Sequence, residues 1–210
     1  MKHILCFGDS NTHGSNPRGG RWDYNERWTG VLQNLLGNEY RIIEEGCGAR
    51  TSVITDDLER SDVGINSLPV ALHSHSPLDL VIIMLGTNDM KHRFNLLPVD
   101  IAVASGKLVK LVKDYNYGSH KTPEVIMISP IEIGEGIEKS VDNTGFSKQS
   151  VEISRSLAPH YETYAKYFGA HFFNAAKYAK PSPYDLLHME KEDHLALATA
   201  LAPFIKDIIG

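Results

Sequence analysis

A serine that could act as a nucleophile follows a short apolar run near the start of the chain. Residues 4–7 read Ile-Leu-Cys-Phe, and Gly8-Asp9-Ser10-Asn11 comes directly after them. The apolar run predicts a buried strand, and the glycine permits a sharp turn where the strand ends. A serine hydroxyl is inert unless a base accepts its proton and donors stabilise the oxyanion. Taken alone, this position favours a serine that caps a helix, so its role depends on partners elsewhere.

Asp185 and His188 could supply that base. They stand three residues apart in Asp185-Leu186-Leu187-His188, so on one turn their side chains lie on the same side. The aspartate could then accept the imidazole Nδ1–H and leave Nε2 facing the serine. A surface loop is the more common fate of such a pair.

His194 competes for the role of base because Asp193 precedes it directly. Adjacent residues on a helix do not face one another, so Asp193 is poorly placed to orient this imidazole. We therefore predict that His188 is the base and that His194 caps or packs the last helix.

Two further motifs could stabilise an oxyanion. Asn88 lies in Gly86-Thr87-Asn88-Asp89, directly after an apolar run, and its amide can donate a hydrogen bond without changing protonation. The alternative is an asparagine that only forms a turn. The segment Gly46-Cys47-Gly48-Ala49 could present a backbone N–H to the same point. It could equally be a plain glycine-rich turn, and the local sequence supports both interpretations.

Hydrophobic periodicity predicts strands and helices in alternation. Short apolar runs predict strands at residues 4–7, 40–44, 80–85, 125–128 and 170–173. Helical spacing predicts helices at residues 26–36, 65–73, from 98 onward, at 147–168 and at about 193–209. Pro159 should kink or split the helix at 147–168, because it removes a backbone donor. Residues 12–25, 52–76, 131–146 and 174–192 are rich in loop-forming residues.

Such alternation predicts an α/β protein, a three-layer α/β/α sandwich around five parallel strands. The polar motifs follow the first, second, third and fifth strands. Because ligands of such sheets sit outside the carboxyl ends of the strands, all of these motifs should meet at one edge. A single domain over residues 1–210 is expected, since no linker, repeat or low-complexity segment interrupts the chain.

Composition excludes several classes of function. A net charge of −5 leaves no basic footprint for nucleic acid or anionic lipid. No apolar run is long enough to cross a membrane, and the N-terminus lacks the pattern of a secretory signal, so we expect a cytoplasmic protein without membrane insertion. The two cysteines, Cys6 and Cys47, have no metal-binding spacing and are expected to be free, buried thiols.

Cofactor motifs are also missing from the sequence. There are ten histidines, but no HExxH or paired-cysteine motif occurs, so no metal is expected. The first apolar run is not followed by G-x-G-x-x-G, which disfavours a dinucleotide site. The absence of G-x-S-x-G argues against an ordinary α/β-hydrolase.

Together the motifs resemble the SGNH (GDSL-like) hydrolases. The resemblance covers the whole chain, with Phe7-Gly8-Asp9-Ser10 near the start, Gly86-Thr87-Asn88-Asp89 in the middle and Asp185-x-x-His188 near the end. Other stretches are similar to the arylesterase/acyltransferase branch, namely Arg27-Trp28-Thr29-Gly30-Val31-Leu32, Glu44-Glu45-Gly46, Ala49-Arg50-Thr51 and residues 78–85.

The resemblance implies a flavodoxin-like sheet and the hydrolysis of small carboxylic esters without a metal or organic cofactor. It also implies that the acyl group can pass to alcohols and that the chain forms a homo-oligomer. By position, Ser10 would be the nucleophile, His188 the general base and Asp185 its orienting carboxylate. The oxyanion donors would be the Ser10 N–H, the Asn88 side chain and a backbone N–H that we assign to Ala49, with Gly48 as the alternative.

Two positions depart from the family pattern. Ala49 stands where the family usually has glycine, and it can serve as a backbone donor if its φ is negative. His13 stands where related sequences often carry an aromatic residue such as Trp, and a more polar pocket could weaken acyl transfer relative to hydrolysis.

The substrate pocket should be walled by the loops at 12–25, 52–76 and 131–146, because loops at strand ends carry specificity. Candidate pocket residues are Asn11, His13, Trp22, Trp28 and Phe146. Two other functions remain open. One is a carbohydrate acetylesterase with the same triad, and the other is a flavodoxin-like module that binds a small ligand without catalysis.

Overall fold

The protein is built on one parallel β-sheet, described with its helices by the computed structural model over residues 1–59, 61–140 and 145–210. The sheet has five strands in the order β2-β1-β3-β4-β5. They are β1 (Lys2–Gly8), β2 (Tyr40–Gly46), β3 (Leu80–Met84), β4 (Glu124–Ser129) and β5 (His171–Asn174). Every neighbouring pair is parallel, which confirms the predicted sheet.

The buried parts of the central strands are apolar because both of their faces are covered. Along β1, Ile4 and Cys6 pack into one core cluster, whereas Leu5 and Phe7 pack into the other. Successive side chains of a strand point to opposite faces, so a strand that is covered on both sides needs apolar residues at every position. Both cysteines are free, but only Cys6 is buried, and Cys47 is half-buried.

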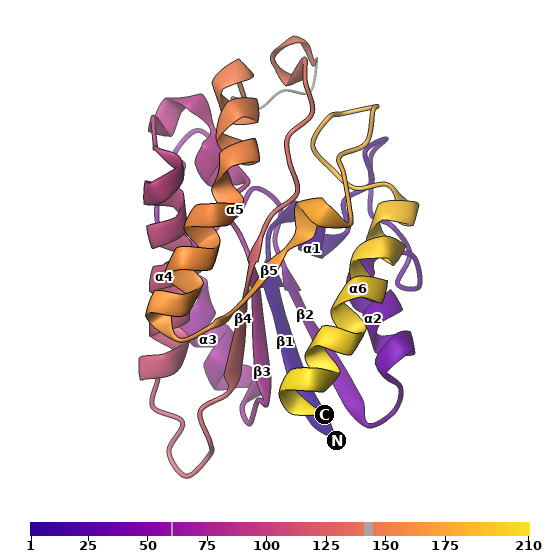
Figure 1. Ribbon diagram of the computed structural model, residues 1–210, viewed down its shortest axis with the longest axis vertical. Coiled ribbons are helices and arrows are strands. Elements are labelled where there is room, and N and C mark those ends of the chain that lie inside the picture. Colours follow the sequence, from indigo (N-terminus) through magenta and orange to yellow (C-terminus); the bar gives the residue numbers. More distant parts are fainter. Residues whose placement is uncertain (60, 141–144) are drawn as a thin grey trace.

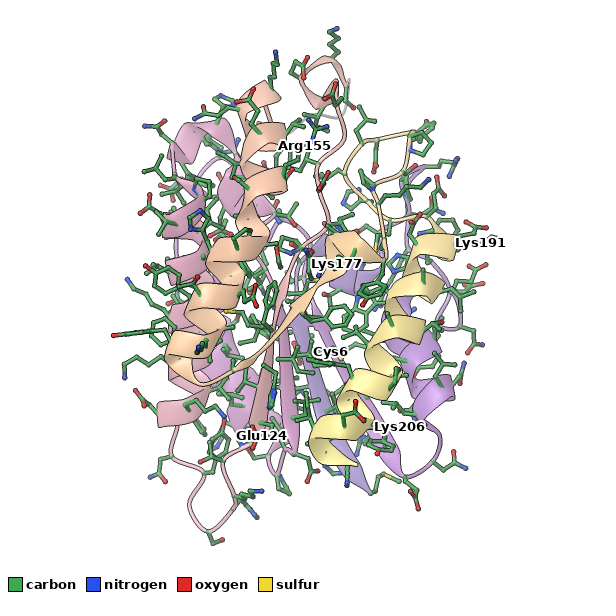
Figure 2. All side chains as sticks on the ribbon, in the orientation of Figure 1. Cys6, Glu124, Arg155, Lys177, Lys191 and Lys206 are labelled. Atoms are coloured by element: carbon green, nitrogen blue, oxygen red, sulfur yellow. The ribbon has the colours of Figure 1, made fainter. Side chains whose placement is uncertain are left out.

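Helices cover the two faces of the sheet (Figure 1). The helices α3 (Gly64–His75), α4 (Pro98–Asp114) and α5 (Lys148–Phe168) contribute to one core cluster. The helices α2 (Trp28–Leu36) and α6 (Lys191–Ile209) contribute to the other. Figure 2 shows Arg155 on α5 and Lys191 on α6 at the periphery, where both are exposed. The predicted three-layer α/β/α sandwich is therefore confirmed.

Two predicted elements differ from the structure. The segment after Ser10 begins not as a loop but as a short helix, α1 (Ser10–His13), which ends at Gly14 with a φ of 82°. Helix α5 continues through Pro159 without a split. Arg155, whose carbonyl loses the intrahelical bond that proline cannot supply, lies on the exposed side, where water can replace that bond.

Most other boundaries lie within two residues of the predicted ones. Helix α3 is longer than expected at both ends, α6 begins already at Lys191, and β2 extends to Gly46. Single 3₁₀ turns occur at Asn88–Met90, His92–Phe94, Ile137–Lys139 and Ala175–Lys177. Residue 60 and residues 141–144, which belong to the predicted loops at 52–76 and 131–146, lie outside the described residues.

The carboxyl edge of the sheet contains a switch point between β1 and β3. The chain passes from β1 to β2 on one side and then to β3 on the other side of β1. The pairing of Gly8 with both Gly46 and Met84 brings the three strand ends to the same height. Such a switch point is where ligands of open α/β sheets bind. None of the helices described is both long and apolar enough to cross a membrane.

Candidate active site

Ser10 is the first residue of α1 rather than its cap. Asp9 has the capping role, because its Oδ1 accepts the backbone N–H of Asn11 at 3.0 Å. The hydroxyl of Ser10 is thus free for another partner. Its own N–H lies in the first turn of the helix and has no hydrogen-bond acceptor in the described part of the chain.

Two glycines allow α1 to lie directly on the sheet. A Cβ at Gly8 would lie 2.1 Å from Thr12 Oγ1, and a Cβ at Gly46 would lie 2.1 Å from the backbone nitrogen of His13. Both distances are far below van der Waals contact, so only glycine permits this approach. As a result the Ser10 turn (residues 9–13) packs directly against the ends of β1 and β2, and Ser10 is only 8% exposed.

A chain of hydrogen bonds joins Ser10, His188 and Asp185. The Nε2 of His188 lies 2.9 Å from Ser10 Oγ, and its Nδ1 lies 2.6 Å from Asp185 Oδ2. An ionised carboxylate can only accept, so Nδ1 carries the proton and Nε2 accepts the O–H of Ser10. The structure therefore brings together the three residues that the sequence proposed as a triad, although 178 positions separate Ser10 from His188.

Asp185 is held in its charged form. Burial opposes ionisation, but hydrogen bonds from the His188 ring and from backbone N–H groups outweigh it and lower the pKa of Asp185. The backbone donors are Leu187 and His188, both 3.0 Å from Oδ1. The carboxylate thus shapes the turn that carries the histidine as well as orienting its ring.

The His188 loop (residues 182–190) is also fixed at its other backbone groups. The N–H of Ser182 donates to the carbonyl of His188 at 2.7 Å, and the N–H of Leu186 donates to the carbonyl of Ser182 at 2.9 Å. Leu186 has a φ of 65°, a left-handed conformation that leucine rarely adopts. Strain of this kind persists only where the surrounding contacts define the backbone fully.

The Ala49 loop (residues 47–52) is tied to the end of β1 by an arginine. Arg50 Nη1 donates to the carbonyl of Gly8 at 2.8 Å and also to the carbonyl of Glu45. Its guanidinium lies over the ring of Phe7, 4.1 Å from the centroid, and Arg50 Nε pairs with Asp62 at 2.5 Å. Arg50 is 4% exposed, so a buried cation ties this loop to Gly8, two residues before Ser10.

Ala49 adopts a positive φ of 59°, and the expected negative φ is wrong. The N–H of Arg50 donates to the carbonyl of Cys47, so Gly48 and Ala49 are the central residues of a tight turn. A left-handed residue at the second central position is typical of a type II turn, which normally has glycine there. Within the described residues neither the Gly48 N–H nor the Ala49 N–H has an acceptor, so both are available as donors.

Asn88 and Asp89 bind the same loop from the end of β3. Asn88 Nδ2 donates to the carbonyl of Arg50 at 3.1 Å, which leaves its second N–H free for another acceptor. The Asp89 carboxylate accepts the backbone N–H of Ser52 at 3.0 Å and lies 3.3 Å from the Ser52 hydroxyl. Asn88 is therefore held against the Ala49 loop, as an oxyanion donor must be, and Asp89 fixes the far end of that loop.

Two carboxyl groups lie buried beneath this site. Burial raises the pKa of Asp89 to about 6, although the hydrogen bonds from Ser52 favour its charged form, and nearby Asp9 adds to the rise. Burial likewise raises the pKa of Asp9, which is 1% exposed. Burial thus opposes the ionisation of both carboxyl groups.

His194 does not compete with His188. It is fully buried, and its Nδ1 accepts the backbone N–H of Trp28 at 3.2 Å, so it caps the start of α2 instead of its own helix. The predicted capping role is correct in kind but falls on a different helix. Burial lowers the pKa of His194 to about 3 and keeps the ring neutral, and the charge of Arg27, together with that of His188 whenever that ring is protonated, acts in the same direction.

The candidate pocket residues are divided between the surface and the core. Phe146 is 2% exposed and Trp28 fully buried, and both belong to the core clusters. Trp22 is half-buried and donates from Nε1 to the carbonyl of Met189 at 3.1 Å. His13 is half-buried at the end of α1, where burial and the charges of Arg21 and Arg27 lower its pKa. Of these four, only Trp22 and His13 present surface to a ligand.

Several supporting residues were not singled out from the sequence. Arg50, Ser52 and Asp89 hold the Ala49 loop, and the signal for Asp89 is a charged residue directly after an apolar strand. Asn11, predicted as a pocket residue, is 2% exposed and bonds to the main chain of the His188 loop. Across the described ranges, no group of three or more His, Cys, Asp or Glu is arranged to hold a metal ion.

Comparison with known proteins assigns the chain to a family. The model of the GDSL-like Lipase/Acylhydrolase family matches residues 6–197. No curated protein sequence gives a significant match to the chain.

Solved structures of esterases are similar over the full length of the chain. A carbohydrate acetylesterase family member from Sinorhizobium meliloti is 32% identical, with a TM-score of 0.92 and 100% of each chain covered. The native aryl esterase of M. smegmatis is 33% identical, with a TM-score of 0.89 over 99% of this chain and 100% of its own. The predicted family and fold are confirmed by these matches.

Proposed function

The chain belongs to the GDSL-like lipase/acylhydrolase family of SGNH hydrolases, and on that premise we propose that it is a serine esterase. Its substrates would be small carboxylic esters with an aryl or short-chain acyl group. The nucleophile is Ser10, the base is His188 and the orienting carboxylate is Asp185. The observation that supports these roles is the continuous chain of hydrogen bonds from Ser10 Oγ through the imidazole to Asp185.

The first half of the reaction forms an acyl-enzyme. His188 Nε2 takes the proton of Ser10 while Oγ bonds to the ester carbonyl carbon, and the carbonyl π electrons move to the oxygen. The resulting oxyanion accepts hydrogen bonds from the Ser10 N–H, the Ala49 N–H and Asn88 Nδ2, with the Gly48 N–H as the alternative. The imidazolium then protonates the leaving oxygen, and the bond between this oxygen and the carbonyl carbon breaks.

The second half releases the acid. His188, now neutral, takes a proton from water as the water oxygen bonds to the acyl carbon, and the same donors hold the second oxyanion. Collapse breaks the bond to Ser10 Oγ, which recovers its proton from His188. Asp185 remains ionised throughout and stabilises the imidazolium, consistent with its lowered pKa.

Hydrolysis of p-nitrophenyl acetate by Ser10→Ala tests the proposal. We expect the variant to fold and to lose nearly all activity, because no other group can form the acyl-enzyme. Ser182→Ala is a matched control, since its hydroxyl bonds to Glu190 in the same loop as His188 but lies outside the hydrogen-bond chain. If Ser10→Ala hydrolyses the ester at a rate similar to wild type, the assignment of the nucleophile is wrong.

A second candidate is a carbohydrate acetylesterase with the same residues. The match to the carbohydrate acetylesterase family member from S. meliloti favours it, and so does the polar, half-buried His13 at the end of α1. Comparing kcat/KM for acetylated sugars and for aryl acetates separates the two candidates. A preference for the sugar esters would identify the acetylesterase.

Acyl transfer to alcohols, a homo-oligomeric state, a single domain over residues 1–210 and a cytoplasmic location stay predictions. Acyl transfer is measured by the ratio of methyl ester to free acid formed in aqueous methanol. Light scattering on the purified protein measures the number of subunits. Labelling of Ser10 by a fluorophosphonate would argue against the non-catalytic binding module.

A further inference from the structure

Asn11 connects the Ser10 turn directly to the loop that carries His188. Its Oδ1 accepts the N–H of Met189 at 3.0 Å, and its Nδ2 donates to the carbonyl of Leu187 at 3.3 Å. These two residues flank His188 in the chain. The amide of Asn11 therefore holds the backbone on both sides of the histidine, and at 2% exposure it does so away from water.

The geometry of this contact suits positioning. Asn11 adjoins Ser10 in α1, and its own N–H is fixed by the capping bond to Asp9. An amide donates and accepts in one plane, so its two bonds fix both the distance and the orientation of the backbone that it contacts. The backbone groups of His188 itself are held by other partners, Asp185 and Ser182.

We propose that Asn11 is a positioning residue that sets the distance between Ser10 Oγ and His188 Nε2. The proposal rests on the function proposed above, since it assumes that this distance matters for proton transfer. Asn11 touches the main chain that carries the base, and it contacts neither the imidazole ring nor the serine hydroxyl through a hydrogen bond. Misplacement of reacting groups by about 1 Å can cost about a hundredfold in rate.

A purely structural role makes a different prediction. Without the amide, Leu187 and Met189 each keep a backbone group with no partner, and stability falls whatever the function of the loop. Under the positioning role, turnover falls as well, at temperatures where the variant is fully folded. The alignment of the imidazole with Asp185 also changes.

The test uses Asn11→Leu, which keeps the branched shape of the side chain but forms neither hydrogen bond, and Asn11→Ala, whose small side chain suits a helix. We expect kcat for p-nitrophenyl acetate to fall about tenfold to a hundredfold, with KM changed by less than about threefold. The proton resonance of the His188 Nδ1–H, bonded to Asp185 at 2.6 Å, should shift or broaden. Arg18→Met is the matched control, because it removes an ion pair with Glu190 and a cation–π contact with Tyr184 in the same loop but leaves the hydrogen bonds to Leu187 and Met189 in place.

The outcomes separate this proposal from the proposed function. If either variant folds and retains the wild-type kcat and the wild-type resonance, Asn11 is structural only and the proposal is overturned. If kcat and the resonance change in Arg18→Met as much as in the Asn11 variants, the effect is not specific and the proposal also fails. Failure of the proposed function would instead appear as full activity in Ser10→Ala.

Discussion

The His188 loop contacts the Ser10 turn, and the Ala49 loop contacts β1, the strand before that turn. The two loops are held in place by different kinds of contact. Each contains a residue with a left-handed backbone that is not glycine, Leu186 at 65° and Ala49 at 59°. The His188 loop is bound to the Ser10 turn by the neutral amide of Asn11. The Ala49 loop is bound by the buried charges of Arg50 and Asp89.

This difference follows from what each loop must do. In the proposed mechanism the His188 loop carries a group that gains and loses a proton, and the neutral amide of Asn11 can hold the backbone beside that group in the same way in both states. The Ala49 loop presents backbone N–H groups whose protonation does not change, so the charged side chains of Arg50 and Asp89 can hold it without disturbing a proton transfer. The contact that Asp89 makes with the Ala49 loop should therefore respond to pH, whereas the contacts that Asn11 makes with the His188 loop should not.

The largest effect should come from Asp185, the carboxylate that contacts the His188 ring. Asp185→Asn removes the acceptor that holds the Nδ1 proton and should lower kcat by about ten-thousandfold, because the wrong tautomer then faces Ser10. The circular dichroism spectrum should not change. Asp193→Asn is the control, since that carboxylate accepts the backbone N–H of Lys180 away from Ser10. Equal losses in both variants would remove the special role of Asp185.

A smaller loss is expected where the Ala49 loop meets β3. Asn88→Ala removes one oxyanion donor and the bond to the carbonyl of Arg50, and kcat should fall roughly a hundredfold to a thousandfold with KM little changed. The exposed Asn34→Ala is a control for asparagine truncation. Unchanged kcat in Asn88→Ala would exclude its amide from the oxyanion site.

The pH response of the Ala49 loop can be measured through Asp89. Its pKa is raised from 3.8 to about 6 in the folded chain, so between these pH values the folded state keeps a proton that the unfolded state has lost. The contribution of Asp89 to the free energy of unfolding should therefore fall as pH rises through this window, by roughly 3 kcal/mol at about 1.4 kcal/mol per pH unit.

Asp89→Asn should remove this contribution. Urea unfolding between pH 4 and pH 7 should then show a flatter dependence on pH than the wild type, while the amide can still accept from the Ser52 N–H. Asn11→Leu should lower stability by the same amount at each pH, since its hydrogen bonds are neutral. If the free energy of unfolding of Asp89→Asn depends on pH as steeply as that of the wild type, Asp89 is not the source of the pH response.

The smallest effect concerns the strained turn of the Ala49 loop. Glycine adopts a positive φ without strain, so Ala49→Gly should raise the free energy of unfolding by about 0.5–1 kcal/mol after the greater flexibility of the unfolded chain is subtracted. Activity should be retained, because the N–H is the same. A loss of stability would indicate that the alanine methyl group packs more favourably than the strain costs.

Much of the fold was predictable because it depends on local patterns. Successive side chains of β1 are buried on opposite faces of the sheet, so the strand contains a continuous apolar run that the sequence shows directly. Polar motifs follow the strand ends, which marks the edge of the sheet where they meet. The spacing of Asp185 and His188 indicated that their side chains could meet, as they do, and the family resemblance supplied the roles predicted for them. The contacts that hold the site were not predictable in the same way. Asn11 and Met189 lie 178 positions apart, and only the folded sheet brings them together.

Local patterns also failed where distant residues decide a local conformation. Ala49 adopts a backbone angle that its own sequence disfavours, and its loop is held from outside by Asn88, which donates to the carbonyl of Arg50. The start of α2 has no side-chain cap of its own, and the cap comes from His194 on α6. In both cases the stabilising partner is remote in sequence, so a local pattern carries no signal for it.

Covalent labelling of Ser10 tests the central claim most directly. The wild-type protein is treated with a fluorophosphonate probe, digested and mapped by mass spectrometry. We predict a single adduct on the peptide that contains Ser10, and we predict that this adduct is lost in Ser10→Ala and forms far more slowly in His188→Ala. An unlabelled Ser10, or an adduct on another serine that persists in Ser10→Ala, would contradict the account.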